Sequence, residues 1–216
     1  TKAPSKGIYR SRLDVATGRL SPAELAAETK DPAWLALHPT GKFLYAIDES
    51  ADAQRTPGQG LSAYALDAHS GALTLLNQQD TASSGACHIS VDATGRALLV
   101  AHYGGGGVSA VALQPDGRLG ALGTVVQHTG SSVHPARQKA PHAHQIVVSP
   151  DNRFAFVPDL GLDRVLTYAL APSTARLTAP AASGTSLPPG SGPRHLAFHP
   201  AGRFAYVISE LLCTMT

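Results

Sequence analysis

Residues 194–210 read RHLAFHPAGRFAYVISE, which is an apolar stretch, a His-Pro-Ala-Gly turn and a second apolar stretch. Three further segments repeat this pattern, namely residues 33–49 (AWLALHPTGKFLYAIDE), 87–103 (CHISVDATGRALLVAHY) and 144–160 (HQIVVSPDNRFAFVPDL). Glycine, proline, aspartate and asparagine favour tight turns, and the flanking residues favour extended strands. Each segment is therefore predicted to form a β-hairpin, and the four hairpins begin 54, 57 and 50 residues apart.

A second type of hairpin is expected in the intervals between those four. The segments that show it are residues 7–20, 61–75, 108–119 and 165–177. Each period of about 50 residues then holds about four strands and almost no helical pattern. A two-sheet sandwich would not explain this register, whereas one four-stranded sheet per period is typical of a β-propeller. The sequence therefore predicts an all-β protein of the β-propeller class with about four four-stranded blades.

The number of blades bears on how the chain is organised. We expect residues 1–216 to form a single β-propeller domain. Four-bladed rings lie at the lower limit of this architecture, and neither end of the chain supplies an evident closing strand. We therefore expect a chain that is truncated at both ends relative to a larger ring, so that it begins and ends within a blade.

Composition and charge exclude several other classes of protein. Charged residues make up only 15% of the chain and hydrophobic residues 43%, which excludes a disordered polyampholyte, a coiled coil and a long-helix bundle. A net charge of +2 from scattered Lys and Arg predicts neither a nucleic-acid nor a membrane surface. Two cysteines cannot form a disulfide scaffold. No membrane span or signal peptide is evident, so we expect a cytoplasmic protein.

Propeller geometry predicts where a functional site would lie. The first strand of each blade runs beside the central channel, so equivalent positions of successive blades converge around one axis. The second strand returns antiparallel, and its last residues reach the same face. The residues at these two positions are Ala33, Cys87, His144 and Arg194, and then Glu49, Tyr103, Leu160 and Glu210. Their chemistry varies while the apolar positions stay nearly uniform, which is typical of a site built on a scaffold.

Three of these residues are predicted to act together. His144 is the candidate for acid–base chemistry because imidazole titrates nearest to neutral pH, the alternative being a histidine that only satisfies backbone groups. Arg194 offers a planar fork for a carboxylate or phosphate, or else it forms a surface or inter-blade ion pair. Glu210 would orient His144, shuttle a proton, or pair with Arg194.

The longest loop between hairpins, residues 127–142, adds positive charge near the same face. It carries Arg137, Lys139 and His142, which predict a cationic mouth for a phosphorylated or carboxylated sugar.

Metal and serine-nucleophile chemistry are not expected. The spacing of the histidines in and beside this loop matches no zinc signature, and no clustered acidic or cysteine ligands accompany them. These histidines are His128, His134, His142 and His144. The chain also lacks the Gly-x-Ser-x-Gly elbow of many serine hydrolases.

Several motifs resemble the lactonase family of seven-bladed β-propellers. They include residues 134–144 (HPARQKAPHAH), 157–165 (VPDLGLDRV) and 192–200 (GPRHLAFHP). This family contains the propeller-type 6-phosphogluconolactonases and the fungal carboxy-muconate lactonizing enzymes, and the resemblance covers essentially the whole chain. Seven blades would need roughly 350 residues, whereas this chain has 216.

The resemblance implies a function and assigns residues to it. The expected reaction is hydrolysis of 6-phosphogluconolactone to 6-phosphogluconate, a step of the pentose phosphate pathway, without a cofactor. His144, Arg194 and Glu210 are the expected catalytic residues: a general base, a group that stabilises the oxyanion or holds the substrate's anionic group, and a carboxylate that fixes the histidine. Arg137, with Lys139 and His142, would bind the substrate.

Two other functions stay open at this point. A cycloisomerase of the carboxy-muconate type would use the same histidine and glutamate to move a proton on carbon, and the arginines to bind carboxylates. A non-catalytic propeller that binds a partner is the third reading, since repeat scaffolds often serve that purpose.

Overall fold

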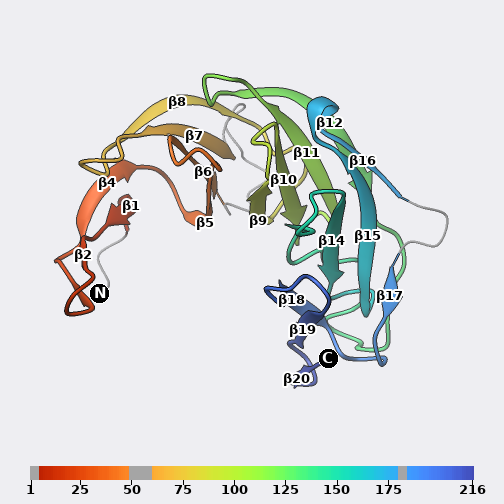
Figure 1. Ribbon diagram of the computed structural model, residues 1–216. Coiled ribbons are helices and arrows are strands. Elements are labelled where there is room, and N and C mark those ends of the chain that lie inside the picture. The colour runs from red at the N-terminus through yellow and green to blue at the C-terminus, as the bar shows by residue number, and fades with distance from the viewer. Residues whose placement is uncertain (1–4, 49–59, 180–183) are drawn as a thin grey trace.

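The computed structural model describes residues 5–48, 60–179 and 184–216, and its regular elements are strands apart from one short 3₁₀ turn, η1 (Pro172–Thr174). The strands form sheets that follow one another in chain order round an arc (Figure 1). The two ends of the arc, near β1 (Gly7–Arg10) and β20 (Thr214–Met215), lie apart in that view. In the part of the chain that is described, no helix has the length and hydrophobicity needed to cross a membrane.

Three sheets form the complete blades, and all their neighbouring strands are antiparallel. The first consists of β5 (Pro32–Leu37), β6 (Phe43–Asp48), β7 (Leu61–Leu66) and β8 (Leu73–Gln79). The second consists of β9 (Ala86–Val91), β10 (Ala97–His102), β11 (Gly107–Leu113) and β12 (Leu119–Gln127). The third consists of β13 (Val147–Val148), β14 (Phe154–Asp159), β15 (Arg164–Ala171) and β16 (Arg176–Thr178), with β17 (Thr185–Ser186) paired to β15. The repeated four-stranded sheets that the sequence predicts are thus confirmed.

Incomplete sheets lie at both ends of the arc. The last sheet contains β18 (Pro193–Phe198), β19 (Ala205–Ser209) and β20. The first sheet pairs β1 with β4 (Glu24–Glu28), while β2 (Leu13–Asp14) and β3 (Arg19–Leu20) form a small separate hairpin. The sequence predicted one hairpin over residues 7–20, and that prediction is wrong for β1. The reason is packing, because Ile8 is buried with Ala27 of β4 instead.

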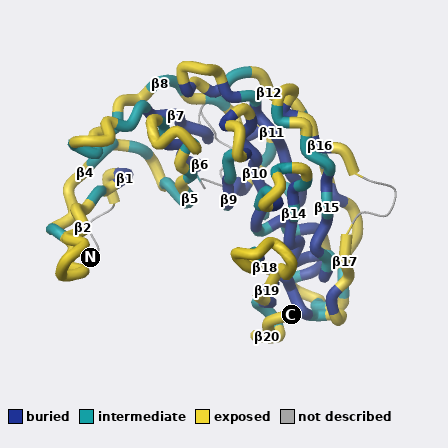
Figure 2. Tube along the Cα trace, viewed as in Figure 1, coloured by how far each residue is buried: buried dark blue, intermediate teal, exposed yellow. Residues whose placement is uncertain are grey.

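The core lies between the blades, and β10 shows how the sequence builds it. Successive side chains of a strand point to opposite faces. Leu98 and Val100 pack toward the first blade, whereas Leu99 and Ala101 pack toward the third, and all four are fully buried. A strand that is buried on both faces needs this continuous apolar run, and each large side chain contributes about 1.5–3 kcal/mol. Figure 2 shows the buried residues concentrated along β10, β11, β14 and β15.

The predicted turns join the first two strands of the blades at one end, which we call the turn end. The turn between β9 and β10 is held by Asp92, whose carboxylate accepts hydrogen bonds from the amides of Thr94, Arg96 and Ala97. Gly95 has a φ of +71°, a conformation that L side chains rarely adopt. Turn chemistry of this kind is local, which is why it can be read from the sequence.

Candidate active site

At the other end of the blades, the first strands carry β-bulges. Pro32 pairs with Asp48 and Trp34 with Ile47, so that Ala33 has no partner across the ladder. The same register shift makes Cys87 the extra residue of β9. It also leaves Arg194 unpaired in β18. A bulge inserts one extra residue and re-aims the neighbouring side chains. These extra residues occupy the first-strand positions that the sequence predicted to converge around one axis.

His144 occupies the corresponding place in the third blade. The isolated bridge between Ala143 and Asp159 is offset by one residue from the β13–β14 register, so an extra residue lies between them. The His144 amide donates to the carbonyl of Pro158 at 3.0 Å. Proline has no N–H to return to the ladder. The His144 carbonyl accepts instead from the Cys87 thiol, with the sulfur 3.3 Å away.

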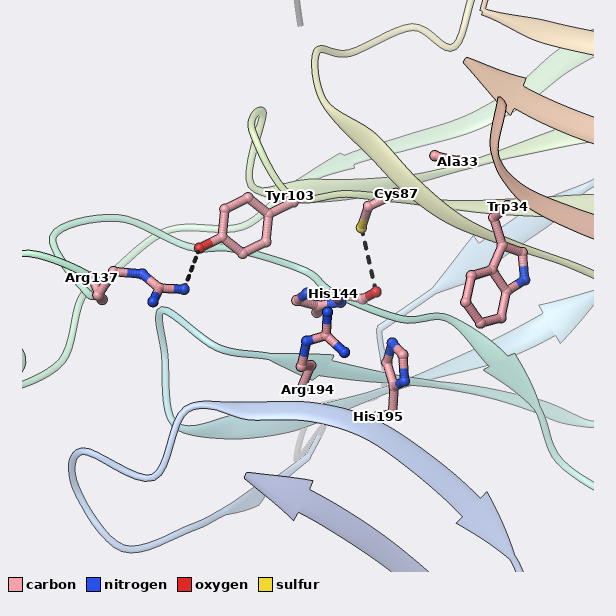
Figure 3. Close-up of a pocket in the computed structure, with 8 residues that line it drawn as sticks. All are labelled: Ala33, Trp34, Cys87, Tyr103, Arg137, His144, Arg194 and His195. Atoms are coloured by element: carbon pink, nitrogen blue, oxygen red, sulfur yellow. Dashed lines mark hydrogen bonds between the residues drawn. The ribbon is translucent and has the colours of Figure 1, made fainter. Parts of the chain in front are cut away.

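These four extra residues line a single cavity of about 330 Å³ (Figure 3). Its lining consists of Ala33, Trp34, Cys87, Tyr103, Arg137, His144, Arg194 and His195. Two pairs of consecutive residues line it together, as the bulges require, since regular strands would turn every second side chain away. The predicted convergence of the four first-strand positions is therefore confirmed. Of the second-strand positions, Tyr103 lines the cavity, Leu160 is fully buried, and Glu49 lies outside the described residues.

Glu210 binds two arginines beside this cavity. Its Oε1 accepts from Arg137 Nη2 at 2.7 Å, and its Oε2 lies 3.1 Å from Arg194 Nε. Burial would raise the pKa of Glu210, but the hydrogen bond and charge of Arg137, with the charge of Arg194, bring it below its ordinary value. We call these three residues the arginine–glutamate cluster. The predicted pairing of Glu210 with Arg194 is confirmed.

His144 is an imidazole on which the charges of both Arg194 and Glu210 act. Burial, and then the positive charge of Arg194, lower the pKa of His144 to about 4, while Glu210 acts in the opposite direction. The imidazole is therefore neutral at pH 7 and able to accept a proton. Its Nδ1 is buried and has no hydrogen-bond partner among the described residues, which leaves Nε2 as the nitrogen that could reach a bound molecule.

Glu210 does not hold the ring of His144 in the way that the sequence suggested. Both carboxylate oxygens face arginines, and within the described ranges no hydrogen bond joins Glu210 to His144. The ring is instead packed against other rings, with Tyr103 at a centroid distance of 5.4 Å and His195 at 5.2 Å, both edge-on. Packing, rather than the carboxylate, fixes its orientation.

The three residues of the long loop that the sequence expected near the cavity have different positions. Arg137 lines the cavity and also donates to the Tyr103 hydroxyl at 3.1 Å. His142 lies behind Tyr103, stacked on its ring at 4.5 Å and hydrogen-bonded through Nδ1 to its carbonyl oxygen at 2.8 Å. Lys139 is exposed and is not among the lining residues. The structure thus brings Arg137 to the cavity directly, His142 through Tyr103, and Lys139 not at all.

Sequence reasoning missed a row of ring side chains next to the bulges. The ring of Trp34 lies 4.4 Å from that of His88, tilted by 39°, and 5.8 Å from that of His195. Burial, together with the charges that His195 and His144 can carry, lowers the pKa of His88 to about 3. The signal was present, because the second residue of the four repeats reads Trp34, His88, Gln145 and His195.

The histidines considered for a metal have separate partners. His128 is buried between Asp159, at 2.7 Å, and the Tyr168 hydroxyl, at 2.9 Å. His134 Nδ1 accepts from the amide of Arg137 at 3.2 Å. Across residues 5–48, 60–179 and 184–216, no three His, Cys, Asp or Glu side chains are grouped so that they could hold a metal ion.

Comparison with known proteins shows which family and which relatives this chain is similar to. The family model described as "Lactonase, 7-bladed beta-propeller" matches residues 1–216. A 6-phosphogluconolactonase from Bacillus subtilis is 40% identical over 212 residues, which are 98% of this chain and 58% of that protein. The chain therefore spans less than two thirds of the length of this relative.

Solved structures agree with that match. The periplasmic gluconolactonase of Pseudomonas aeruginosa superimposes with a TM-score of 0.89 at 36% identity, covering 98% of this chain and 60% of that chain. A putative 6-phosphogluconolactonase from Bacteroides fragilis gives a TM-score of 0.88 at 33% identity, with 97% and 59% of the two chains covered.

Proposed function

This chain belongs to the lactonase family of seven-bladed β-propellers, and from that premise we propose that the protein hydrolyses a sugar lactone, 6-phosphogluconolactone, to 6-phosphogluconate. The observation that carries the proposal is the position of a neutral imidazole, His144, in one cavity with the guanidinium groups of Arg137 and Arg194. A base that is free to accept a proton then faces a site suited to an anionic ester.

In this reaction His144 acts as the general base. Its imidazole accepts a proton from a water molecule whose oxygen attacks the carbonyl carbon of the lactone, which forms a tetrahedral oxyanion. Collapse of that oxyanion breaks the bond between the carbonyl carbon and the ring oxygen. The ring oxygen takes the proton back from the imidazolium and becomes a hydroxyl, and the other product is a carboxylic acid that ionises. Such proton transfer contributes about 10²–10⁴-fold to a rate.

The arginine–glutamate cluster supplies positive charge for binding an anionic substrate. Two guanidinium groups and one carboxylate leave one net positive charge beside neutral His144. Arg194, which is electrostatically coupled to His144, would stabilise the oxyanion. Arg137 would hold the phosphate, because a guanidinium fork matches phosphate oxygens. Glu210 would hold both guanidinium groups in place beside the cavity, since each of its oxygens binds one of them.

Two further residues of the long loop take lesser roles in this proposal. His142 supports substrate binding by holding Tyr103 in place, since it stacks on that ring and bonds its carbonyl oxygen. Lys139 contributes only long-range attraction for an anionic substrate, because its side chain is exposed and away from the cavity lining.

The test is a hydrolysis assay with 6-phosphogluconolactone formed in place by oxidation of glucose 6-phosphate. The appearance of 6-phosphogluconate is followed and the spontaneous rate subtracted. We expect turnover that falls by about 10²–10⁴-fold in His144→Ala. Isomerisation of carboxy-muconate without lactone hydrolysis would indicate the cycloisomerase instead. Binding of 6-phosphogluconate in a calorimeter without turnover would indicate a binding protein.

We also propose that the protein works in the cytoplasm. The chain has only two cysteines, Cys87 and Cys213, which is too few for the disulfide scaffold typical of proteins from an oxidising compartment. Cell fractionation checks this, because recovery of the protein with periplasmic markers would contradict it.

A further inference from the structure

Asp163 is a buried carboxylate that no step of the proposed reaction uses. It lies in the turn between β14 and β15 and is only 3% exposed. Its backbone has a φ of +53°, which is uncommon for a residue other than glycine. A buried charge in such a conformation is costly unless several hydrogen bonds satisfy it.

The side chain of Asp163 joins two segments that are far apart in the sequence. Its Oδ1 accepts from Gln138 Nε2 at 2.8 Å and from the amide of Gly192 at 2.7 Å. Its Oδ2 accepts from the hydroxyl of Ser132 at 2.5 Å and from the amide of Gly190 at 2.6 Å. Ser132 and Gln138 belong to the long loop, whereas Gly190 and Gly192 belong to the segment that leads into β18.

Each of these segments delivers one arginine of the arginine–glutamate cluster. Gln138, which is fully buried, is adjacent in sequence to Arg137. Gly192 comes two residues before Arg194. The carbonyl of Gly192 also accepts from the amide of Glu210 at 2.8 Å. One carboxylate therefore lies a short covalent or hydrogen-bonded path from all three members of the cluster.

We propose that Asp163 is a positioning residue that sets the spacing of Arg137, Glu210 and Arg194 across the cavity. This inference rests on the proposed function for its kinetic consequence, but its structural part does not. Burial would raise the pKa of Asp163, but the hydrogen bonds from Gly192, Ser132, Gly190 and Gln138 outweigh it and keep this pKa below its ordinary value. The carboxylate is thus ionised at neutral pH, and both oxygens are acceptors.

The variant Asp163→Asn tests the proposal with little change of shape. One oxygen becomes an NH₂ group, which would face either the amide of Gly190 or that of Gly192 and could not accept from it. We expect a rise in KM and a fall in kcat for 6-phosphogluconolactone that together lower kcat/KM by about 100-fold, since an error of about 1 Å in placement has an effect of this size.

A matched control separates positioning from general loss of stability. Asp92 is likewise buried and accepts hydrogen bonds from three amides, but it lies at the turn end. Asp92→Asn should lower the free energy of unfolding as much as Asp163→Asn and leave both kinetic constants within twofold of the parent. Equal kinetic losses in the two variants, or an unchanged kcat/KM in Asp163→Asn, would overturn the proposal.

A second measurement does not depend on activity. Hydrogen exchange of the amides in residues 128–142 and 187–192 should be faster in Asp163→Asn than in the parent, with the rest of the protein unchanged. Unchanged exchange in these two segments would also overturn the proposal. If the parent protein hydrolyses no lactone, the proposed function fails, and the exchange rates alone decide the role of Asp163.

Discussion

The two ends of the blades follow different rules. At the turn end, the links between first and second strands are built alike, as His-Pro-Thr-Gly, Asp-Ala-Thr-Gly, Ser-Pro-Asp-Asn and His-Pro-Ala-Gly. At the cavity end, the corresponding strands carry bulges whose extra residues are Ala33, Cys87, His144 and Arg194. At the turn end, where the residues serve folding alone, the sequence repeats from blade to blade. At the cavity end, where the bulges interrupt the regular ladder, the side chains differ in chemistry.

The difference is also energetic. At the turn end, Asp92 accepts hydrogen bonds from its own turn and from Asn152 of the next blade, so its charge is satisfied locally. At the cavity end, burial comes first among the causes that lower the pKa values of His88, His144 and His195. Buried imidazoles lower the stability of the fold at acid pH, because protonating them inside the protein is unfavourable. At neutral pH they are uncharged and can accept a proton.

The largest effect should come from the cavity end. His144→Ala removes the proposed base, and we expect kcat for 6-phosphogluconolactone to fall by about 10²–10⁴-fold while the protein stays folded. His199→Ala, which removes an exposed histidine of the turn end, is the matched control and should keep the parent rate. A His144→Ala variant that hydrolyses the lactone at the parent rate would remove His144 from the mechanism.

The next largest effect separates two residues that the sequence treated alike. Arg137→Ala should raise KM by roughly 10–100-fold, because it removes a charge-assisted hydrogen bond to the substrate's anionic group. Lys139→Ala should change KM by less than twofold, because this side chain is exposed and away from the cavity lining. Steady-state kinetics on both variants decide the matter, and equal increases in KM would show that the loop rearranges when substrate binds.

A smaller effect, on stability alone, is expected at the turn end. Gly95→Ala would place a methyl group against the ring of His38 at a φ of +71°, and should lower the free energy of unfolding by about 1–3 kcal/mol. Gly18→Ala has nearly the same φ, +70°, but open space around it, so its loss should be smaller. Urea denaturation measures both, and a change in kcat/KM for Gly95→Ala would contradict the separation of the two ends.

The smallest effect concerns pH. The pKa of His144 in the folded protein is about 4, below the value of about 6.5 in an unfolded chain. The unfolded state then binds more protons between these values, so stability falls as pH falls from about 6.5 to about 4. His144→Gln should make this decline shallower, as measured by urea unfolding at several pH values. A decline as steep as that of the parent would mean that His144 is not desolvated.

The architecture could be read from the sequence because its signals are local. Alternating apolar residues and turn-forming residues act within a few positions, so the strands of the three complete blades were expected where they are found. The convergence of equivalent positions followed from the repeat alone. Residues 7–20 show the limit of such reading, because β1 pairs with β4, where Ile8 is buried against Ala27.

The chain by itself determined the repeated hairpins, the turn end and the set of residues that would meet around one axis, since periodicity and turn chemistry depend on near neighbours. Only the tertiary structure decided how those residues meet. It placed Glu210 between Arg137 and Arg194 instead of on His144. It also removed water from His144, which lowers the pKa of this residue. Glu210 contacts Arg194 and Arg137, which lie 16 and 73 positions away in the sequence. Such contacts, and the loss of solvent around the His144 ring, depend on how whole blades pack against one another. No local sequence pattern encodes that packing.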